Sequence, residues 1–100
     1  MPTDNSEPKA QKQNLKQKID LRENCYNFSL RIIKFLKNIP ENRISYILTN
    51  QLLRSATSIG ANVIEAKSST YKKDFIRFYD LALRSVNETE YWLRLTKDAM

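Results

Sequence analysis

Two glutamates, Glu65 and Glu88, come nearest to catalytic or metal-binding chemistry by their type and spacing. Each falls close to the apolar stripe of a predicted helix, and carboxylates that face one another inside a helical bundle can hold metal ions. Such sites also need a Glu-x-x-His pattern, and the sequence contains no histidine. We therefore favour a solvated or ion-paired role, with either glutamate meeting Arg54, and we predict no metal site.

The composition also argues against nucleophilic and nucleotide-binding chemistry. Ser/His and Cys/His pairs need a histidine, and the single cysteine, Cys25, lies in an apolar repeat that is typical of a buried thiol. A phosphate-binding loop needs several glycines beside a lysine, whereas Gly60 is the only glycine. We expect a protein that is not an enzyme and that has neither a catalytic residue nor a cofactor.

The basic residues give a clearer binding signal. The chain has 17 Lys and Arg against 11 Asp and Glu, and its formal net charge of +6 favours an anionic partner. The candidate nucleic-acid-binding residues are Arg31, Lys34, Lys37, Lys67, Lys72, Lys73 and Arg77. On one chain these are ordinary solvated charges, but repeated around a ring of subunits they would form a positive belt suited to phosphate backbones.

A helix-turn-helix is a weaker possibility, because Ala56 and Gly60 have the spacing of its small residue and its turn glycine. The recognition helix would then span 61–69, where Asn62 and Lys67 are almost the only side chains able to read bases. We disfavour sequence-specific DNA binding for this reason.

Three long helices must position these side chains. From Leu21 to Ile39 apolar residues recur at steps of four and three, and Pro40 ends this helix at or before Ile39. A second helix is expected to begin between Asn42 and Ser45 and to continue through Gly60. Its predicted inward stripe is Ile44, Leu48, Leu52, Ser55, Ile59, Asn62 and Ala66.

The third helix follows a polar break and is expected to start after Thr70 as its N-cap. Its predicted inward stripe is Phe75, Tyr79, Ala82, Val86, Thr89, Leu93 and Thr96. A second apolar strip beside it, the candidate interface, consists of Phe78, Leu81, Trp92 and Leu95. At about 28 residues the helix would be roughly 42 Å long, which predicts an elongated antiparallel bundle.

The domain organisation follows from these elements. Residues 1–14 are polar and read as a flexible tail, and residues 15–100 read as one all-α, up-down helical bundle domain. No stretch approaches the roughly 20 apolar residues of a membrane helix, so we expect a soluble cytoplasmic protein without membrane contact. A chain this short with such long helices is also expected to form homo-oligomers.

Three segments carry a family resemblance. Residues 51–66, 74–83 and 88–95 read QLLRSATSIGANVIEA, DFIRFYDLAL and ETEYWLRL. In this order and spacing they resemble the bacterial four-helix-bundle family of 23S rRNA intervening-sequence proteins. The matching polar positions are Arg54, Asn62, Glu65 and Glu88.

The resemblance implies an antiparallel four-helix bundle that assembles into a ring of five, with a fourth helix beyond the position of Met100. Either this chain is truncated there or another chain completes its bundle. A more distant likeness to the accessory protein of diversity-generating retroelements implies binding to RNA and a reverse transcriptase.

Two functions are therefore expected. The first is a non-enzymatic oligomeric adaptor that binds structured RNA, or a nucleic-acid enzyme such as a reverse transcriptase, through basic surfaces. The alternative is a purely protein-binding scaffold that docks through the exposed apolar strip around Trp92.

Overall fold

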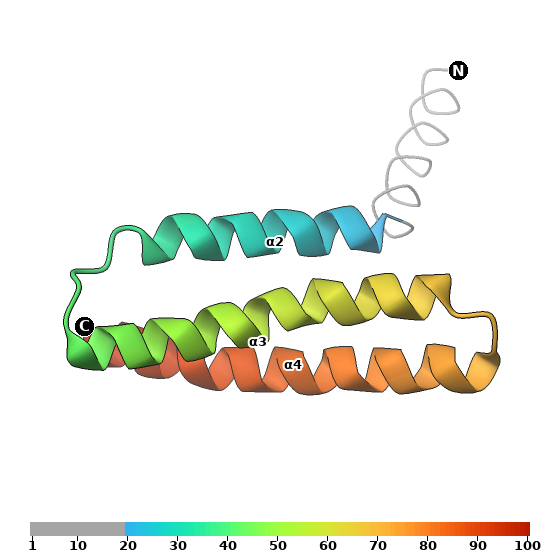
Figure 1. Cartoon of the computed structure of the whole chain (residues 1–100). Coiled ribbons are helices and arrows are strands. Elements are labelled where there is room, and N and C mark those ends of the chain that lie inside the picture. The colour runs from blue at the N-terminus through green and yellow to red at the C-terminus, as the bar shows by residue number, and fades with distance from the viewer. Residues whose placement is uncertain (1–19) are drawn as a thin grey trace, which may run out of the picture.

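The computed structural model describes residues 20–100, which form three α-helices and no strand. Helix α2 spans Leu21–Leu36, α3 spans Arg43–Ser68 and α4 spans Lys72–Ala99. Successive helices run antiparallel, as Figure 1 shows, so the predicted all-α up-down bundle is confirmed. The predicted tail at 1–14 and the first residues of the predicted bundle domain, 15–19, lie outside the described residues.

Helix α3 is the central element of the fold. It packs against both α2 and α4, whereas no Cα atoms of α2 and α4 lie within 8 Å of one another. In Figure 1, α2 and α4 accordingly flank α3, and the C-terminus lies beside the α2–α3 connection. None of the described helices combines the length and the apolar character that crossing a membrane requires.

The start of α3 is set by a capping box. The Asn42 side chain accepts a hydrogen bond from the Ser45 backbone N–H, and the Ser45 hydroxyl accepts one from the Asn42 N–H, both at 2.9 Å. These bonds satisfy two amide groups that would otherwise lack a helical partner. The predicted start between Asn42 and Ser45 is confirmed.

Helix α2 ends at Leu36, which agrees with the predicted end at or before Ile39, and a tighter turn follows in which the Ile39 N–H bonds to the Leu36 carbonyl. The predicted N-cap Thr70 is wrong by one residue: Tyr71 is the N-cap, since its carbonyl accepts from both Asp74 and Phe75. The predicted length of the third helix, 28 residues, is confirmed.

Gly60 lies within α3, as predicted, and allows α2 to come close. A Cβ at this position would sit 3.1 Å from the Cys25 Cβ, which is tighter than almost all such contacts. Because α3 runs unbroken through Ala56 and Gly60 to Ser68, there is no turn between them, and the helix-turn-helix alternative is excluded.

Two buried clusters make up the core. The first contains Cys25, Val63 and Ala82, with Leu21, Ile59 and Tyr79 packed against it. The second contains Ile32, Leu52 and Ala56, with Phe28, Leu36, Trp92 and Leu93 packed against it. Between α3 and α4 the core also has a polar contact, in which the Thr89 hydroxyl donates to the Ser55 hydroxyl at 3.0 Å.

The predicted inward stripes are only partly buried. Ile44 is 63% exposed because the capping box turns the next residue, Ser45, inward, and neighbouring positions on a helix are about 100° apart. On α4 the contact with α3 buries Ala82, Thr89 and Thr96. Phe75 and Val86, from the same predicted stripe, remain 40% and 41% exposed because the three helices leave one side of α4 open.

Candidate functional site

A polar network joins α3 to α4. The Arg54 guanidinium donates two hydrogen bonds to the Gln51 side-chain oxygen, at 3.1 and 2.9 Å, and forms an ion pair with Glu88. The same Glu88 oxygen accepts a bond from the Trp92 indole N–H at 3.0 Å. The Trp92 and Arg54 hydrogen bonds hold the pKa of Glu88 below its ordinary value, because both favour the ionised carboxylate.

The network shows which of the two glutamates, Glu65 or Glu88, pairs with Arg54. Glu88, not Glu65, meets Arg54. Asn62 instead donates from its amide to the Ser58 carbonyl one turn earlier in α3, at 2.9 Å, and Glu65 is exposed. Of the four polar family-motif positions, the structure therefore brings only Arg54 and Glu88 into contact.

The network is built to hold two helices together. Its carboxylate already has a guanidinium and an indole as partners, and the side chains of Arg54 and Glu88 remain 54% and 40% exposed. An ion pair at this exposure adds little stability by itself, but it selects one register between α3 and α4. Among residues 20–100 no group of three His, Cys, Asp or Glu side chains lies close enough together to hold a metal ion.

Cys25, the only cysteine in the sequence, is buried against α3. Burial raises the pKa of its thiol, because the charged thiolate is poorly solvated there. A thiol in this environment is a weak nucleophile at neutral pH.

The predicted basic residues are divided between the two ends of the bundle. Lys34 lies in the last turn of α2 and Lys37 directly follows that helix. Lys67 lies in the last turn of α3 and Lys72 opens α4, and the antiparallel order places these at the opposite end in Figure 1. The two predicted sets therefore do not merge into one surface on a single chain.

Arg31 lies one turn before Lys34 on α2, at the same end of the bundle. It lines a hollow of about 280 Å³ together with the apolar side chains Phe28, Ile32, Phe35 and Leu93. This hollow lies on the side of the bundle that we call the open side, where residues of α2 and α4 line it and both helices pack against α3.

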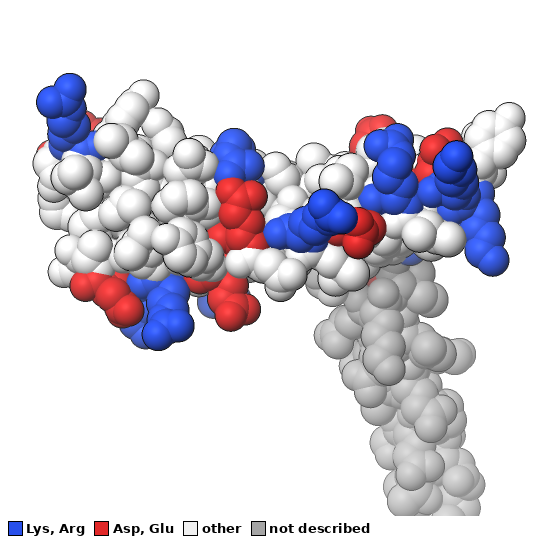
Figure 2. All heavy atoms as spheres, turned by 90° about the horizontal axis from the view of Figure 1, so that it is seen from below, with Lys and Arg blue, Asp and Glu red and all other residues white. Residues whose placement is uncertain are grey.

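At the α3–α4 end the cations are grouped. Lys67, Lys72, Lys73 and Arg77, here called the basic end cluster, are all exposed. Within residues 20–100 the ion pairs are Arg54–Glu88 and Arg84–Asp80, so no described carboxylate forms an ion pair with this cluster. On the face that Figure 2 displays, Lys and Arg occur at both ends and in the middle, with Asp and Glu beside several of them.

An exposed aromatic residue that the sequence pattern did not single out lies beside this cluster. Tyr71 immediately precedes Lys72 and is 71% exposed, and the Arg77 guanidinium lies over the Phe78 ring at 4.4 Å. The available signal was a tyrosine between a polar break and a pair of lysines. Aromatic rings among cations are typical of surfaces that bind single-stranded nucleic acid.

The predicted apolar interface is less open than its sequence indicates. Phe78, Leu81 and Trp92 are half-buried, and Leu95 is 37% exposed. Trp92 packs against the core cluster of Ile32, Leu52 and Ala56 in addition to its bond with Glu88. This tryptophan therefore has a structural role, whatever it contacts outside the chain.

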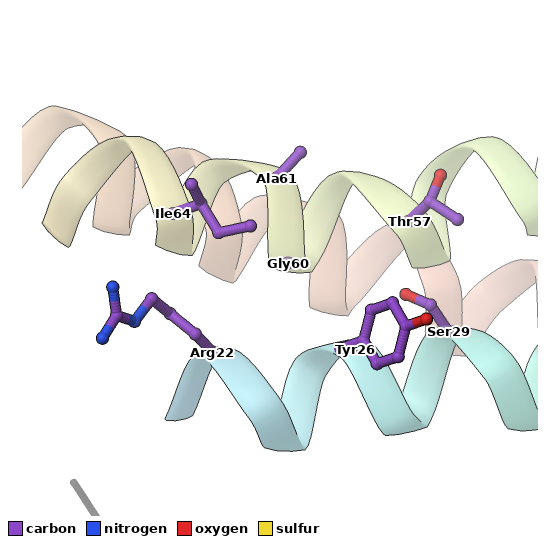
Figure 3. A pocket seen from close by; sticks show the side chains of 7 residues that line it. All are labelled: Arg22, Tyr26, Ser29, Thr57, Gly60, Ala61 and Ile64. Atoms are coloured by element: carbon purple, nitrogen blue, oxygen red, sulfur yellow. The ribbon is translucent and has the colours of Figure 1, made fainter. Parts of the chain in front are cut away.

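A shallow groove of about 220 Å³ lies between α2 and α3. Figure 3 shows side chains from both helices around it, with Gly60 contributing only backbone. Its lining residues are Arg22, Tyr26, Ser29, Thr57, Gly60, Ala61 and Ile64. A lone arginine among hydroxyl and apolar groups offers a contact surface, and no histidine or described carboxylate lines the groove to activate its hydroxyl groups.

Comparison with known proteins agrees with this architecture. A crystal structure from Bacteroides thetaiotaomicron VPI-5482, described as a protein of unknown function from the S23 ribosomal protein family, matches with a TM-score of 0.71 and 37% sequence identity. The match covers 78% of this chain and 70% of that chain. No curated protein matches significantly. The 23S rRNA-intervening sequence protein family matches residues 17–100, and the chain belongs to this family.

Proposed function

We propose that this chain is a non-enzymatic helical adaptor of the cytoplasm that binds structured RNA through the basic end cluster. The observation that carries the proposal is the grouping of four exposed cations around the α3–α4 connection without a described carboxylate partner. Phosphate backbones are the common biological partners of such a surface. The family description, which refers to 23S rRNA, supports RNA as the anion.

Oligomerisation is part of the proposal. One basic end cluster supplies only a few phosphate contacts, and a homo-oligomer, a ring of five by the family resemblance, would repeat it at regular intervals. Linked binding sites gain affinity without new contacts because later binding events become intramolecular. A nucleic-acid enzyme such as a reverse transcriptase would then be held on the same RNA.

The test compares two charge-matched double variants. We expect Lys72→Gln/Lys73→Gln to weaken binding to a labelled structured RNA and to reduce the dependence of log K on log salt by about 0.7 to 0.9 for each lost phosphate contact. Lys34→Gln/Lys37→Gln removes the same charge at the other end of the bundle and is expected to have the smaller effect. The measurement is fluorescence anisotropy of the RNA over a salt series.

Two results would contradict the proposal. Binding that is absent or independent of salt in a well-folded protein would remove RNA as the partner. An equal loss in the two double variants would mean that net charge, and not the basic end cluster, attracts the RNA.

A protein-binding scaffold is the second candidate. The observation in its favour is the open side of the bundle, where Phe35, Phe75 and Val86 are each about two-fifths exposed. Under this alternative, Phe75→Gln/Val86→Gln would abolish association between protein chains, as measured by sedimentation velocity. Added RNA would not change the association of either the wild type or the variant.

A further inference from the structure

We infer that Tyr71 stacks on an unpaired RNA base while the basic end cluster holds the neighbouring phosphates, so that the chain recognises loops or single-stranded ends in preference to duplex. This inference rests on the RNA-binding function proposed above and specifies which part of the RNA is bound. Its three supports are the exposure of Tyr71, the charges around it and the shape of RNA helices.

The Tyr71 side chain is exposed to solvent, and no hydrogen bond or ring contact within residues 20–100 explains its position. At 71% it is the most exposed of the large apolar side chains that the structure describes. Its side chain makes no hydrogen bond and no ring contact with any residue of 20–100, while its backbone caps α4 in an extended conformation. Exposing an aromatic ring to water is unfavourable, and a stacked base would cover it.

The residues that follow Tyr71 in the chain carry the charges that a nucleotide phosphate would need. Lys72 and Lys73 follow it directly, and both are exposed. Arg77, one turn further along α4, lies 4.4 Å above the Phe78 ring, which limits the directions in which its guanidinium can point. Asp74 is the nearby acid, and it is half-buried in the first turn of α4, where a carboxylate is stabilised by the helix dipole.

The choice between unpaired and paired RNA follows from stacking geometry. Bases in an A-form duplex already stack on one another, and the deep, narrow major groove excludes side chains. An exposed ring can therefore stack only on a base with a free face, in a loop, a bulge or a strand end. Lysines alone would bind duplex and loop phosphates alike.

The experiment measures the affinity of the full chain for two labelled RNAs that share one stem, a hairpin with an unpaired loop and a blunt duplex. We expect the hairpin to bind more tightly. Tyr71→Ala should weaken hairpin binding by about 5- to 140-fold, the range for loss of one base–aromatic stack, without changing the salt dependence. Tyr71→Phe should restore binding, because the ring and not the hydroxyl makes the stack.

Tyr46→Ala is the matched control. Tyr46 is 67% exposed in the first turns of α3, at the opposite end of the bundle from the basic end cluster, and we expect its removal to leave hairpin affinity unchanged. Circular dichroism and thermal melting of each variant check that the helices remain intact, as expected for side chains this exposed.

The outcomes separate the two proposals. Suppose that the wild-type chain binds RNA in a salt-dependent way. If Tyr71→Ala then binds the hairpin as tightly as the wild type does, or if the wild type binds the duplex as tightly as the hairpin, the stacking inference is overturned and the adaptor function stands. If the wild-type chain binds no RNA, both are overturned.

Discussion

At the scale of single residues, the hydrogen bonds of Glu88 decide how α3 and α4 are joined. One carboxylate oxygen accepts from both Arg54 and Trp92, which come from different helices. Glu65 has a similar position relative to the predicted stripe, but it is exposed and does not contact Arg54. Glu65 lies on the same helix as Arg54, eleven positions further along, and the helical rise keeps the two about 16 Å apart. Which residue of α4 lies opposite Arg54 depends instead on the register between the two helices.

The lowered pKa of Glu88 leads to a prediction about pH. A carboxylate whose pKa is lower in the folded state than in the unfolded state stabilises the fold above its unfolded pKa of about 4.3, and this stabilisation is lost as pH falls through the folded pKa. We expect the free energy of unfolding of Glu88→Gln to fall less in this acid range than that of the wild type. Urea unfolding at a series of pH values measures the difference.

Trp92 provides an independent readout of the same event. It is the only tryptophan, so its fluorescence reports on the indole that donates to Glu88. We expect the emission of the folded wild type to change as Glu88 is protonated and that of Glu88→Gln to stay constant. An identical acid transition in the two proteins would show that Glu88 is not the titrating group.

At the scale of the elements, small residues on α3 set how closely α2 can approach. Gly60 faces the Cys25 side chain, and Ala56 and Val63 contribute to the two buried clusters on either side of it. A small side chain allows closer backbone approach between helices, at some cost in helix propensity for glycine. The glycine in the middle of α3 is therefore a packing feature, and it does not mark a turn.

This packing predicts the effect of filling the space. We expect Gly60→Val to lower the free energy of unfolding by about 1 to 3 kcal/mol, because the added methyl groups would push α2 away from α3. Ala61→Val, at the neighbouring exposed position, is the control and should change it by no more than about 0.5 kcal/mol. Both are measured by urea denaturation, and equal stabilities of the two variants would contradict the close approach.

At the scale of the whole molecule, three helices leave one side of the bundle open. Phe35 on α2 and both Phe75 and Val86 on α4 are exposed. The hollow lined by Phe28, Phe35 and Leu93 lies between α2 and α4. Exposed apolar surface of this kind is typical of protein interfaces. The proposed oligomer would cover it and would bring several basic end clusters onto one assembly.

A prediction at this scale links assembly to RNA affinity. We expect light scattering to give a mass several times that of one chain for the wild type, and a lower mass for Phe75→Gln/Val86→Gln, because these substitutions make the open side polar. RNA affinity should fall with the mass even though the basic end cluster is unchanged, since the avidity is lost. Unchanged RNA affinity in a dissociated variant would show that a single chain suffices for RNA binding.

The sequence by itself determined the helices, most of their ends and the balance of charge. Apolar periodicity, Pro40 and the Asn42 cap are local features, so they predict local structure without knowledge of the partner helix. The absence of histidine and the excess of lysine and arginine are likewise set by the sequence before any folding is considered.

Only the tertiary structure decided which residues meet. The pairs Arg54–Glu88 and Ser55–Thr89 each join residues 34 positions apart in the chain, and such contacts depend on the register between two helices. The antiparallel order separated the two basic sets and left Tyr71 exposed beside one of them. Helical periodicity places a side chain on a face of its own helix, but it does not specify what lies opposite that face, because the register depends on packing along the whole length of both helices.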